Sequence, residues 1–225
     1  MKIVITGTSQ GLGECLFDSI SCYKKRIKLL AVSRRFTSKQ IALAESNNSL
    51  KLIYMDFSNI ESVKNNLDEL DTGNDEEVIF INNAATIGEI KSVGELHLRN
   101  IIDSINTNFV SPIVIVNFLC KKSKLVTVIN ISSGAANHPI DKWGLYCSTK
   151  NGIKSFLEVA SIQNNIDVIN IDPGVMDTCM QNTIRQAQFH GVDTFIDLKK
   201  KGNLKSATVV AEKIFDSYVK DKIIT

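Results

Sequence analysis

Short runs of apolar, often β-branched residues recur along the chain, separated by longer stretches with a helical pattern. Two of these runs, VIFI and VTVINI, are apolar at nearly every position rather than at every second one. Strands covered by helices on both faces need such a composition, and strands alternating with helices are typical of a parallel sheet. The pattern predicts strands at residues 2–6, 27–33, 50–55, 77–82, 124–131 and 166–171.

Helical segments fall between these strands, at residues 11–23, 37–46, 60–70, 96–120, 144–161 and 208–219. Thr37, Ser58 and Ser206 are candidate N-caps at three of the helix starts. Because parallel crossovers are right-handed, this order favours a single α/β domain over residues 1–225, a doubly wound parallel sheet with helices on both faces. The pattern also allows a short last strand at residues 222–224, for a total of about seven strands.

Residues 175–203 have no clear place in this sheet. A long insertion after the carboxyl end of a strand is more often a cover for a site than filler, so we expect a substrate lid here. Lys199, Lys200, Lys201 and Lys205 are interpreted as a solvated face.

Charge and cysteine content narrow the function classes. The 225 residues hold 26 Lys and Arg against 24 Asp and Glu, and this formal net charge of +2 gives no strong field for nucleic acid or a lipid surface. The five cysteines form no C-x-x-C pair and the three histidines are scattered, so we expect neither disulfides nor a metal site. No signal-peptide pattern is visible, and the most apolar stretch, 109–120, is shorter than the roughly 20 residues of a membrane span. We therefore expect a soluble, cytoplasmic protein with no nucleic-acid or membrane partner.

The stretch TGTSQGLG, residues 6–13, places three glycines between the first strand and the first helix. Backbone N–H groups and the positive end of a helix hold a phosphate at such a position. Gly7, Gly11 and Gly13 are therefore candidate contacts for a dinucleotide pyrophosphate. The spacing is G-x-x-x-G-x-G rather than G-x-G-x-x-G, so a glycine-rich turn without a ligand remains an alternative.

The end of the second strand bears on the choice of cofactor. A site for NAD offers an acid to the adenosine ribose at this point, whereas a site for NADP offers an arginine to the 2′-phosphate. This chain has Ser33, Arg34 and Arg35 there, and a guanidinium can donate two parallel hydrogen bonds to a phosphate. We expect NADPH, with Arg34 as the main contact and Ser33, Arg35 and Ser9 as helpers. The alternative is that both arginines are exposed charges at a strand end.

Three further residues follow the fifth strand. Tyr146 and Lys150 are four apart, so in a helix both project from one face. A neighbouring ammonium lowers the pKa of a phenol, which could then exchange a proton with a carbonyl or alcohol oxygen. Ser133, at the carboxyl end of a central strand, could donate a second hydrogen bond to that oxygen. Taken singly, the pair could be ordinary helix surface, and Ser132 and Ser133 could satisfy backbone groups.

With these residues in place, the chain resembles the short-chain dehydrogenase/reductase family over essentially its full length. The matching pieces are TGTSQGLG at 6–13, Asp56, NNAA at 82–85, Asn108 within NTNFVSP, Ser133, Tyr146, Lys150, and DPGVMDT at 172–178. One departure is Ala85, where the family pattern has glycine.

The resemblance implies a Rossmann-type fold and roles for the matching residues. Tyr146 would donate the proton in reduction, Lys150 would lower its pKa and hold the nicotinamide ribose, and Ser133 would polarise the carbonyl. Asn108 would position a water that joins Lys150 to solvent. With the glycines and arginines above, the expected cofactor contacts are Gly7, Ser9, Gly11, Leu12, Gly13, Ser33, Arg34, Arg35, Asp56, Asn82, Asn83, Ala84, Tyr146, Lys150, Pro173, Gly174, Val175 and Thr178.

Residues 132–150 and 173–186 are similar to the bacterial sepiapterin reductase and benzil reductase branch of the family, whose members reduce α-diketone-like and aromatic carbonyls with NADPH. Trp143, Met176, Met180 and Phe189 could form the apolar wall that such a substrate needs, or could simply pack in the core or the lid.

The sequence therefore predicts an NADPH-dependent carbonyl reductase acting on a ketone or α-diketone. A 3-oxoacyl-carrier-protein reductase remains an alternative, because the lysines at 199–205 could form a docking patch. A non-catalytic NADPH sensor is the alternative from another class. The resemblance also implies a homodimer or homotetramer, paired through the helices at 96–120 and 144–161.

Overall fold

The computed structural model describes residues 1–23, 27–71 and 77–224. Within this part of the chain, six parallel strands form one sheet in the order β3-β2-β1-β4-β5-β6. The strands are β1 (Lys2–Thr6), β2 (Lys28–Ser33), β3 (Leu50–Tyr54), β4 (Glu77–Asn82), β5 (Leu125–Ile131) and β6 (Ile166–Ile171). Each of these strands is confirmed to within one residue at either end.

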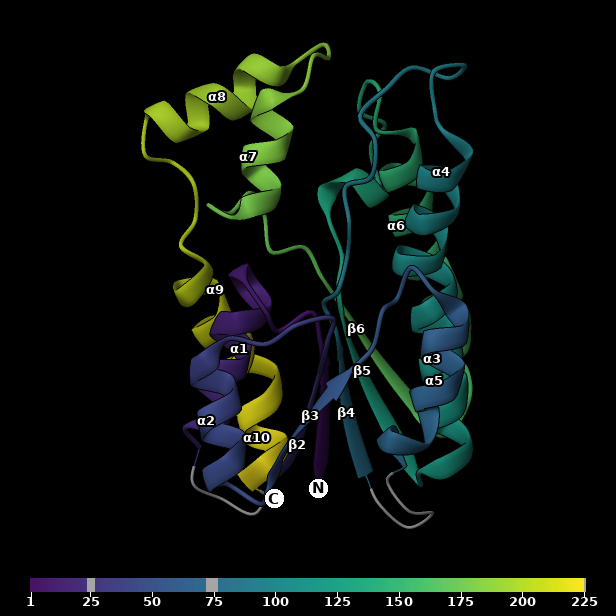
Figure 1. Ribbon diagram of the computed structural model, residues 1–225, viewed down its shortest axis with the longest axis vertical. Coiled ribbons are helices and arrows are strands. Elements are labelled where there is room, and N and C mark those ends of the chain that lie inside the picture. The colour runs from purple at the N-terminus through teal and green to yellow at the C-terminus, as the bar shows by residue number, and fades with distance from the viewer. Residues whose placement is uncertain (24–26, 72–76, 225) are drawn as a thin grey trace.

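Helices cover both faces of the sheet (Figure 1). One face carries α1 (Gly11–Ser21), α2 (Ser38–Ser46), α9 (Ala207–Ile214) and α10 (Lys220–Ile224). The other carries α3 (Ile60–Asn66), α4 (Leu98–Ile105), α5 (Ser111–Lys122) and α6 (Gly144–Ala160). The doubly wound α/β architecture is confirmed.

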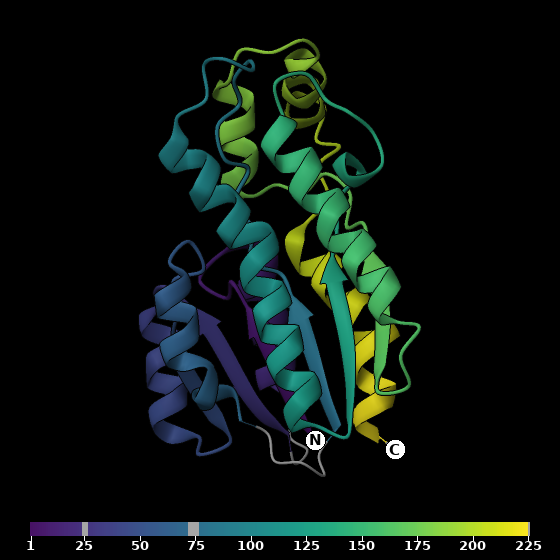
Figure 2. The same ribbon diagram turned by 90° about the vertical axis from the view of Figure 1, so that its right-hand side faces the viewer.

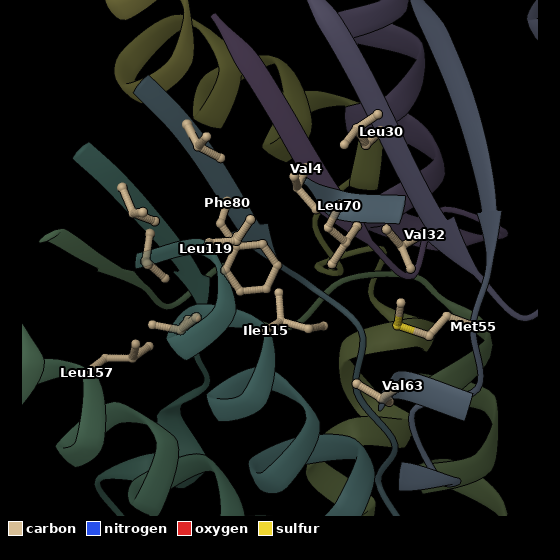
Figure 3. Close-up of a cluster of buried hydrophobic side chains, with 14 of the residues drawn as sticks. Val4, Leu30, Val32, Met55, Val63, Leu70, Phe80, Ile115, Leu119 and Leu157 are labelled. Atoms are coloured by element: carbon tan, nitrogen blue, oxygen red, sulfur yellow. The ribbon is translucent and has the colours of Figure 1, made fainter. Parts of the chain in front are cut away.

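A separate apolar core lies on each side of the sheet, because successive side chains of a strand point to opposite faces. Val4 belongs to the core under α3, α5 and α6, where Phe80, Ile115 and Leu119 are also buried (Figure 3). Ile3 and Ile5 belong to the core under α1 and α9. Burial on both faces explains why the central strands are apolar throughout.

Two of the three candidate N-caps are at the cap positions. Thr37 caps α2, because its hydroxyl accepts from the backbone N–H of Gln40 and the Gln40 side chain accepts from the N–H of Thr37. Ser206 stands at the N-cap position of α9. Ser58 is wrong by one residue, since the side chain of Asn59 accepts from the first turn of α3.

The longest helix runs from Leu98 to Lys122 and joins α4 to α5 through a π-helical turn at Asn106–Val110. By length and composition alone this helix could cross a membrane. The apolar stretch therefore extends beyond residues 109–120, which the sequence analysis took as too short for a span. It packs on the sheet instead, with Ile115, Val116 and Leu119 buried. Figure 2 shows it beside α6.

The strand that the sequence allows at residues 222–224 is a helix. The chain continues from α9 through a π-helical turn at Phe215–Val219 into α10. Phe215 and Val219, one turn apart, are both buried in the core under α1 and α9. Lys220 forms an ion pair with Asp216, four residues earlier. This spacing extends the helical pattern beyond residue 219, so the sheet ends at β6 among the described residues.

Residues 175–203 contain two helices that the sequence pattern did not predict, α7 (Cys179–Gln186) and α8 (Val192–Lys200). Both lie beyond the carboxyl ends of the strands (Figure 1). The two ends of this segment lie side by side. The N–H of Lys205 donates to the carbonyl of Val175 at 3.0 Å, and the N–H of Asp177 donates to the carbonyl of Lys205 at 3.1 Å. Its closure over a substrate stays a prediction.

Candidate active site

A cavity of about 720 Å³ lies at the carboxyl ends of the strands. The strand order reverses between β1 and β4, which is where doubly wound sheets bind their ligands. Most of the predicted site residues line it: Gly7, Ser9, Gly11, Leu12, Gly13, Ser33, Arg34, Asp56, Asn83, Ala84, Ser133, Trp143, Tyr146, Lys150, Pro173, Gly174, Val175, Met176, Thr178 and Met180. The residues that do not line it are Arg35, Asn82, Asn108 and Phe189.

The glycine loop after β1 has a shape that side chains would prevent. Gly7 has φ +72° and Gly11 has φ +61°, both in the left-handed region. A Cβ on Gly13 would lie 2.0 Å from the carbonyl oxygen of Gly7. The side-chain amide of Asn83 donates to the carbonyls of Thr6 and Gly7, at 2.9 and 3.1 Å. The loop therefore opens α1 in a fixed conformation that leaves its backbone at the cavity wall.

One end of the cavity is bounded by the ends of β2 and β3. Ser33 is buried, whereas Arg34 is exposed and lines the cavity. Neither Arg34 nor Arg35 forms an ion pair within the described part of the chain. Asp56 accepts hydrogen bonds from the backbone and hydroxyl of Ser58, at 3.0 and 2.9 Å, which holds the turn after β3 in place. Arg34 is thus available to an anionic ligand.

Tyr146 and Lys150 lie on one face of α6 and both are buried, at 7% and 4% exposure. The ammonium of Lys150 donates to the carbonyl of Ile131, at the end of β5, at 2.8 Å. It lies 5.9 Å from the centre of the Tyr146 ring. Ser133 follows the same strand and shares a hydrogen bond with the Tyr146 side chain. The three predicted residues therefore come together at one wall of the cavity.

Burial dominates the electrostatics of this group. It raises the pKa of Tyr146 to about 12; the hydrogen bond with Ser133 opposes that rise, and the nearby carboxylate of Asp172 adds to it. Burial also lowers the pKa of Lys150 to about 8. The pKa of Tyr146 therefore lies above its ordinary value in the protein alone, because loss of hydration dominates; a lowering of this pKa by Lys150 stays a prediction. At neutral pH Tyr146 is a protonated phenol, the form that can donate a proton.

Asn108 lies in the π-helical turn and its side chain does not face the cavity. Its amide donates to the carbonyl of Thr86 at 2.8 Å and to the hydroxyl of Thr149 at 3.1 Å, and its oxygen accepts from the N–H of Thr86. These bonds tie the loop after β4 to α6. The role of Asn108 in positioning a water stays a prediction.

Asn82 belongs to a row of three amides under the cavity, of which Asn82 and Asn130 are buried. Its side chain donates to Asn130 at 2.9 Å, and Asn130 donates to Asn170 at 2.8 Å. The three residues pair in register on β4, β5 and β6. The Asn82 side chain thus holds the sheet beneath the cavity, whereas Asn83 and Ala84 line it.

The far end of the cavity is aromatic. The ring of Trp143 is 5.8 Å from that of Tyr146, 5.7 Å from that of Phe189 and 5.5 Å from that of Phe195, measured between ring centres. Phe189 packs behind Trp143, while Met180 and Phe195 line the cavity from α7 and α8. Residues 175–203 therefore build one wall of a pocket for an apolar group.

Comparison with known proteins identifies the family. A family model described as short chain dehydrogenase matches residues 1–188. The chain belongs to the short-chain dehydrogenase family. It is thus an oxidoreductase of the class that acts on CH–OH and C=O groups.

Among the relatives of this dehydrogenase, a benzil reductase ((S)-benzoin forming) of Bacillus cereus is 31% identical over 94% of this chain and 91% of its own length. A sepiapterin reductase of Bos taurus is 29% identical over 64% of this chain and 58% of its own length. The crystal structure of the KRED1-Pglu enzyme has a TM-score of 0.80 at 23% identity, covering 99% of this chain and 98% of that one. The branch suggested by residues 132–150 is represented among these relatives.

Some residues of the dehydrogenase site escaped the sequence analysis. Phe195, Ile184 and Gln181 line the cavity from helices that the sequence pattern did not reveal. Asp172 also lines it, and its position directly before Pro173 is a signal that the sequence does carry. Ala85 stands where the family has glycine, and its φ is not positive. Among the residues that the structure describes, Lys142 is the single non-glycine residue with a positive φ.

Proposed function

We propose that this dehydrogenase is an NADPH-dependent carbonyl reductase that acts on a ketone or an α-diketone. The observation that carries the proposal is that Tyr146, Ser133 and Lys150 line the same cavity as the glycine loop and the aromatic side chains. A proton donor stands where a dinucleotide and an apolar carbonyl compound would meet.

The cavity fits NADPH on two counts. At Gly7 and Gly13 a Cβ would collide with the neighbouring backbone, so the loop brings main-chain groups to where a pyrophosphate would lie. Arg34 lines the cavity beside Ser33, with no acid at the end of β2 to repel a 2′-phosphate. We assign the 2′-phosphate to Arg34 and the nicotinamide ribose to Tyr146 and Lys150. Pro173, Gly174, Val175 and Thr178 would border the nicotinamide.

The residues of the chain account for the proton side of the reaction. When bound, the reduced nicotinamide supplies the hydride. Tyr146 donates its phenolic proton to the carbonyl oxygen, so that C=O becomes CH–OH. Ser133 donates a hydrogen bond to the same oxygen as negative charge develops there. The Lys150 ammonium, close to the ring, stabilises the phenolate until solvent returns the proton.

The substrate class follows from the far wall. Trp143, Phe195, Met180 and Ile184 surround the space beyond Tyr146, which suits an aromatic or bulky apolar ketone. Two relatives that match nearly the full length of the chain are benzil reductases of Bacillus species, at 31% and 30% identity. We propose that benzil-like α-diketones are accepted.

The four lysines at 199–205 give little support to a carrier-protein reductase. Lys199 pairs with Asp177, Lys201 pairs with Asp197, and Lys205 donates to the carbonyl of Pro173. Two of the four positive charges are thus paired with a carboxylate, which weakens a docking patch. A sensor without catalysis would not need a buried proton donor such as Tyr146.

We further propose a homodimer or homotetramer in the cytoplasm. Leu98 and Ile102 on α4, with Val159 at the end of α6, are exposed apolar side chains on the two neighbouring helices. Light scattering of the purified protein measures the oligomeric state, and a monomer at micromolar concentration would contradict this assignment.

The activity is tested by the loss of NADPH absorbance with a panel of carbonyl compounds. Turnover of benzil and aromatic ketones is expected. Turnover restricted to a 3-oxoacyl thioester would favour the carrier-protein reductase, and tight NADPH binding without any turnover would favour the sensor.

A further inference from the structure

Asp172 is a carboxylate in the wall of the cavity to which the proposed reaction assigns no role. It directly follows β6, and the strand pairing places it beside the end of β5. Ile131 and Ile171 are in register, and the N–H of Ser132 donates to the carbonyl of Ile171 at 2.7 Å. Asp172 is therefore level with Ser132 on the neighbouring strand end, and close to Ser133.

The carboxylate of Asp172 is held at one oxygen only. Its Oδ1 accepts a hydrogen bond from the N–H of Gly174 at 2.9 Å. Its Oδ2 lies 3.4 Å from the position that a Cβ on Gly134, the residue after Ser133, would take. No donor of the described chain bonds to this second oxygen, and the side chain is exposed where it lines the cavity. The carboxylate is thus fixed in place with one oxygen open to a ligand.

The charge of Asp172 is not neutralised by a neighbour. Asp172 forms no ion pair with any residue that the structure describes, and the ammonium of Lys205 donates to the carbonyl of Pro173 instead. Its charge also reaches the proton donor: burial is the main cause that raises the pKa of Tyr146 to about 12, and the carboxylate of Asp172 adds to the rise. An unpaired negative charge therefore lies near Tyr146 and Ser133.

Under the proposed function, Tyr146 and Ser133 hold the reacting oxygen, so the groups bonded to the carbonyl carbon lie in the same part of the cavity. In a 2-oxo acid one of these groups is itself a carboxylate, and two like charges repel more strongly where protein replaces part of the water. We propose that the carboxylate of Asp172 repels 2-oxo acids and so selects neutral ketones and 1,2-diketones as substrates. The inference rests on the proposed reductase activity and narrows its substrate class.

A matched pair of substrates isolates this repulsion. Phenylglyoxylate and its methyl ester carry the same ketone beside the same phenyl ring, but the acid is an anion at neutral pH and the ester is not. The quantity to measure is the ratio of kcat/KM for the ester to kcat/KM for the acid, with NADPH saturating. Asp172→Asn keeps the shape and the acceptor for Gly174 but removes the charge, so we expect the ratio to fall about tenfold. Asp172→Ser, a second neutral variant, should lower it similarly.

Asp103→Asn is the control, because Asp103 also lines the cavity but is paired with Arg99 at 2.9 Å. We expect the ratio to stay within about twofold in this variant. Added salt should lower the ratio of the wild type and leave that of Asp172→Asn unchanged, since an exposed charge is screened. A ratio that is unchanged in both neutral variants of Asp172, or that falls equally in Asp103→Asn, overturns the inference while leaving the reductase activity intact. A wild-type protein that reduces neither the ester nor benzil refutes the proposed function, and the inference with it.

A second measurement does not depend on turnover. Calorimetric titration of the NADP+ complex with phenylglyoxylate gives a Kd for the anion in the wild type and in Asp172→Asn. We expect the anion to bind about tenfold more tightly to the variant, whereas the Kd for the methyl ester should stay within about twofold. An equal Kd for the anion in the two proteins would contradict a repulsion by Asp172.

Discussion

Arg34 is predicted to separate NADPH from NADH, two cofactors that differ only in the 2′-phosphate. The side chain lines the cavity, is exposed and has no ion-pair partner in the described chain, so a bound phosphate would be its principal charged contact. A hydrogen bond to a charged group contributes about 1.5–3 kcal/mol, and solvent exposure places this one near the lower value. About 1.4 kcal/mol corresponds to a tenfold change in Kd.

We therefore expect Arg34→Ala to weaken NADPH binding about tenfold or more and to leave the Kd for NADH within about twofold. Calorimetric titration of the free enzyme with each cofactor measures both constants. Raising the salt concentration should shrink the wild-type preference, since the contact is exposed. Arg35→Ala is the matched control, because Arg35 stands outside the cavity lining, and its effect should stay below about threefold. Equal losses for NADPH and NADH in Arg34→Ala, or a larger effect from Arg35→Ala, would refute the reasoning.

Two more predictions concern the loop and the buried amine. Gly13→Ala places a Cβ 2.0 Å from a backbone oxygen, so we expect the free energy of unfolding, measured by urea titration, to fall by about 2 kcal/mol or more. We also expect weaker binding of NADPH and NADH alike. A variant as stable as the wild type would argue against the rigid loop. Lys150 has a pKa of about 8 when folded against an ordinary value of 10.5, so the unfolded chain binds more protons between these values and stability rises with pH there. Relative to Lys150→Met, the wild type should gain stability from pH 8 to 10, and parallel curves would contradict the buried ammonium.

The fold was predictable because each strand carries its own local pattern. The runs around Val4, Phe80 and Val128 are apolar on both faces, and helices cover both faces. The last helix was harder to predict, because residues 222–224 are too few to show a period. The helix is favoured because Phe215 and Val219 pack in the core beside α1, against residues far away in the sequence.

The site was predictable where spacing alone fixes geometry, as for Tyr146 and Lys150 on one helix face. The direction of the Tyr146 pKa shift was not, because burial depends on the helices α7 and α8 and on the whole cavity wall. The same holds for Asn82, whose amide pairs with Asn130 on the neighbouring strand rather than facing the cavity. Neighbours from distant parts of the chain decide such details.

The most direct measurement compares the wild type with Tyr146→Phe in NADPH oxidation by benzil, with the Kd for NADPH measured for both. The variant keeps the buried ring and removes only the hydroxyl. We predict that kcat falls about 10²–10⁴-fold, the usual contribution of a positioned general acid, while the Kd for NADPH rises by about tenfold at most, the loss of one hydrogen bond to the ribose. Equal turnover by the two proteins would contradict the claim that Tyr146 donates the proton.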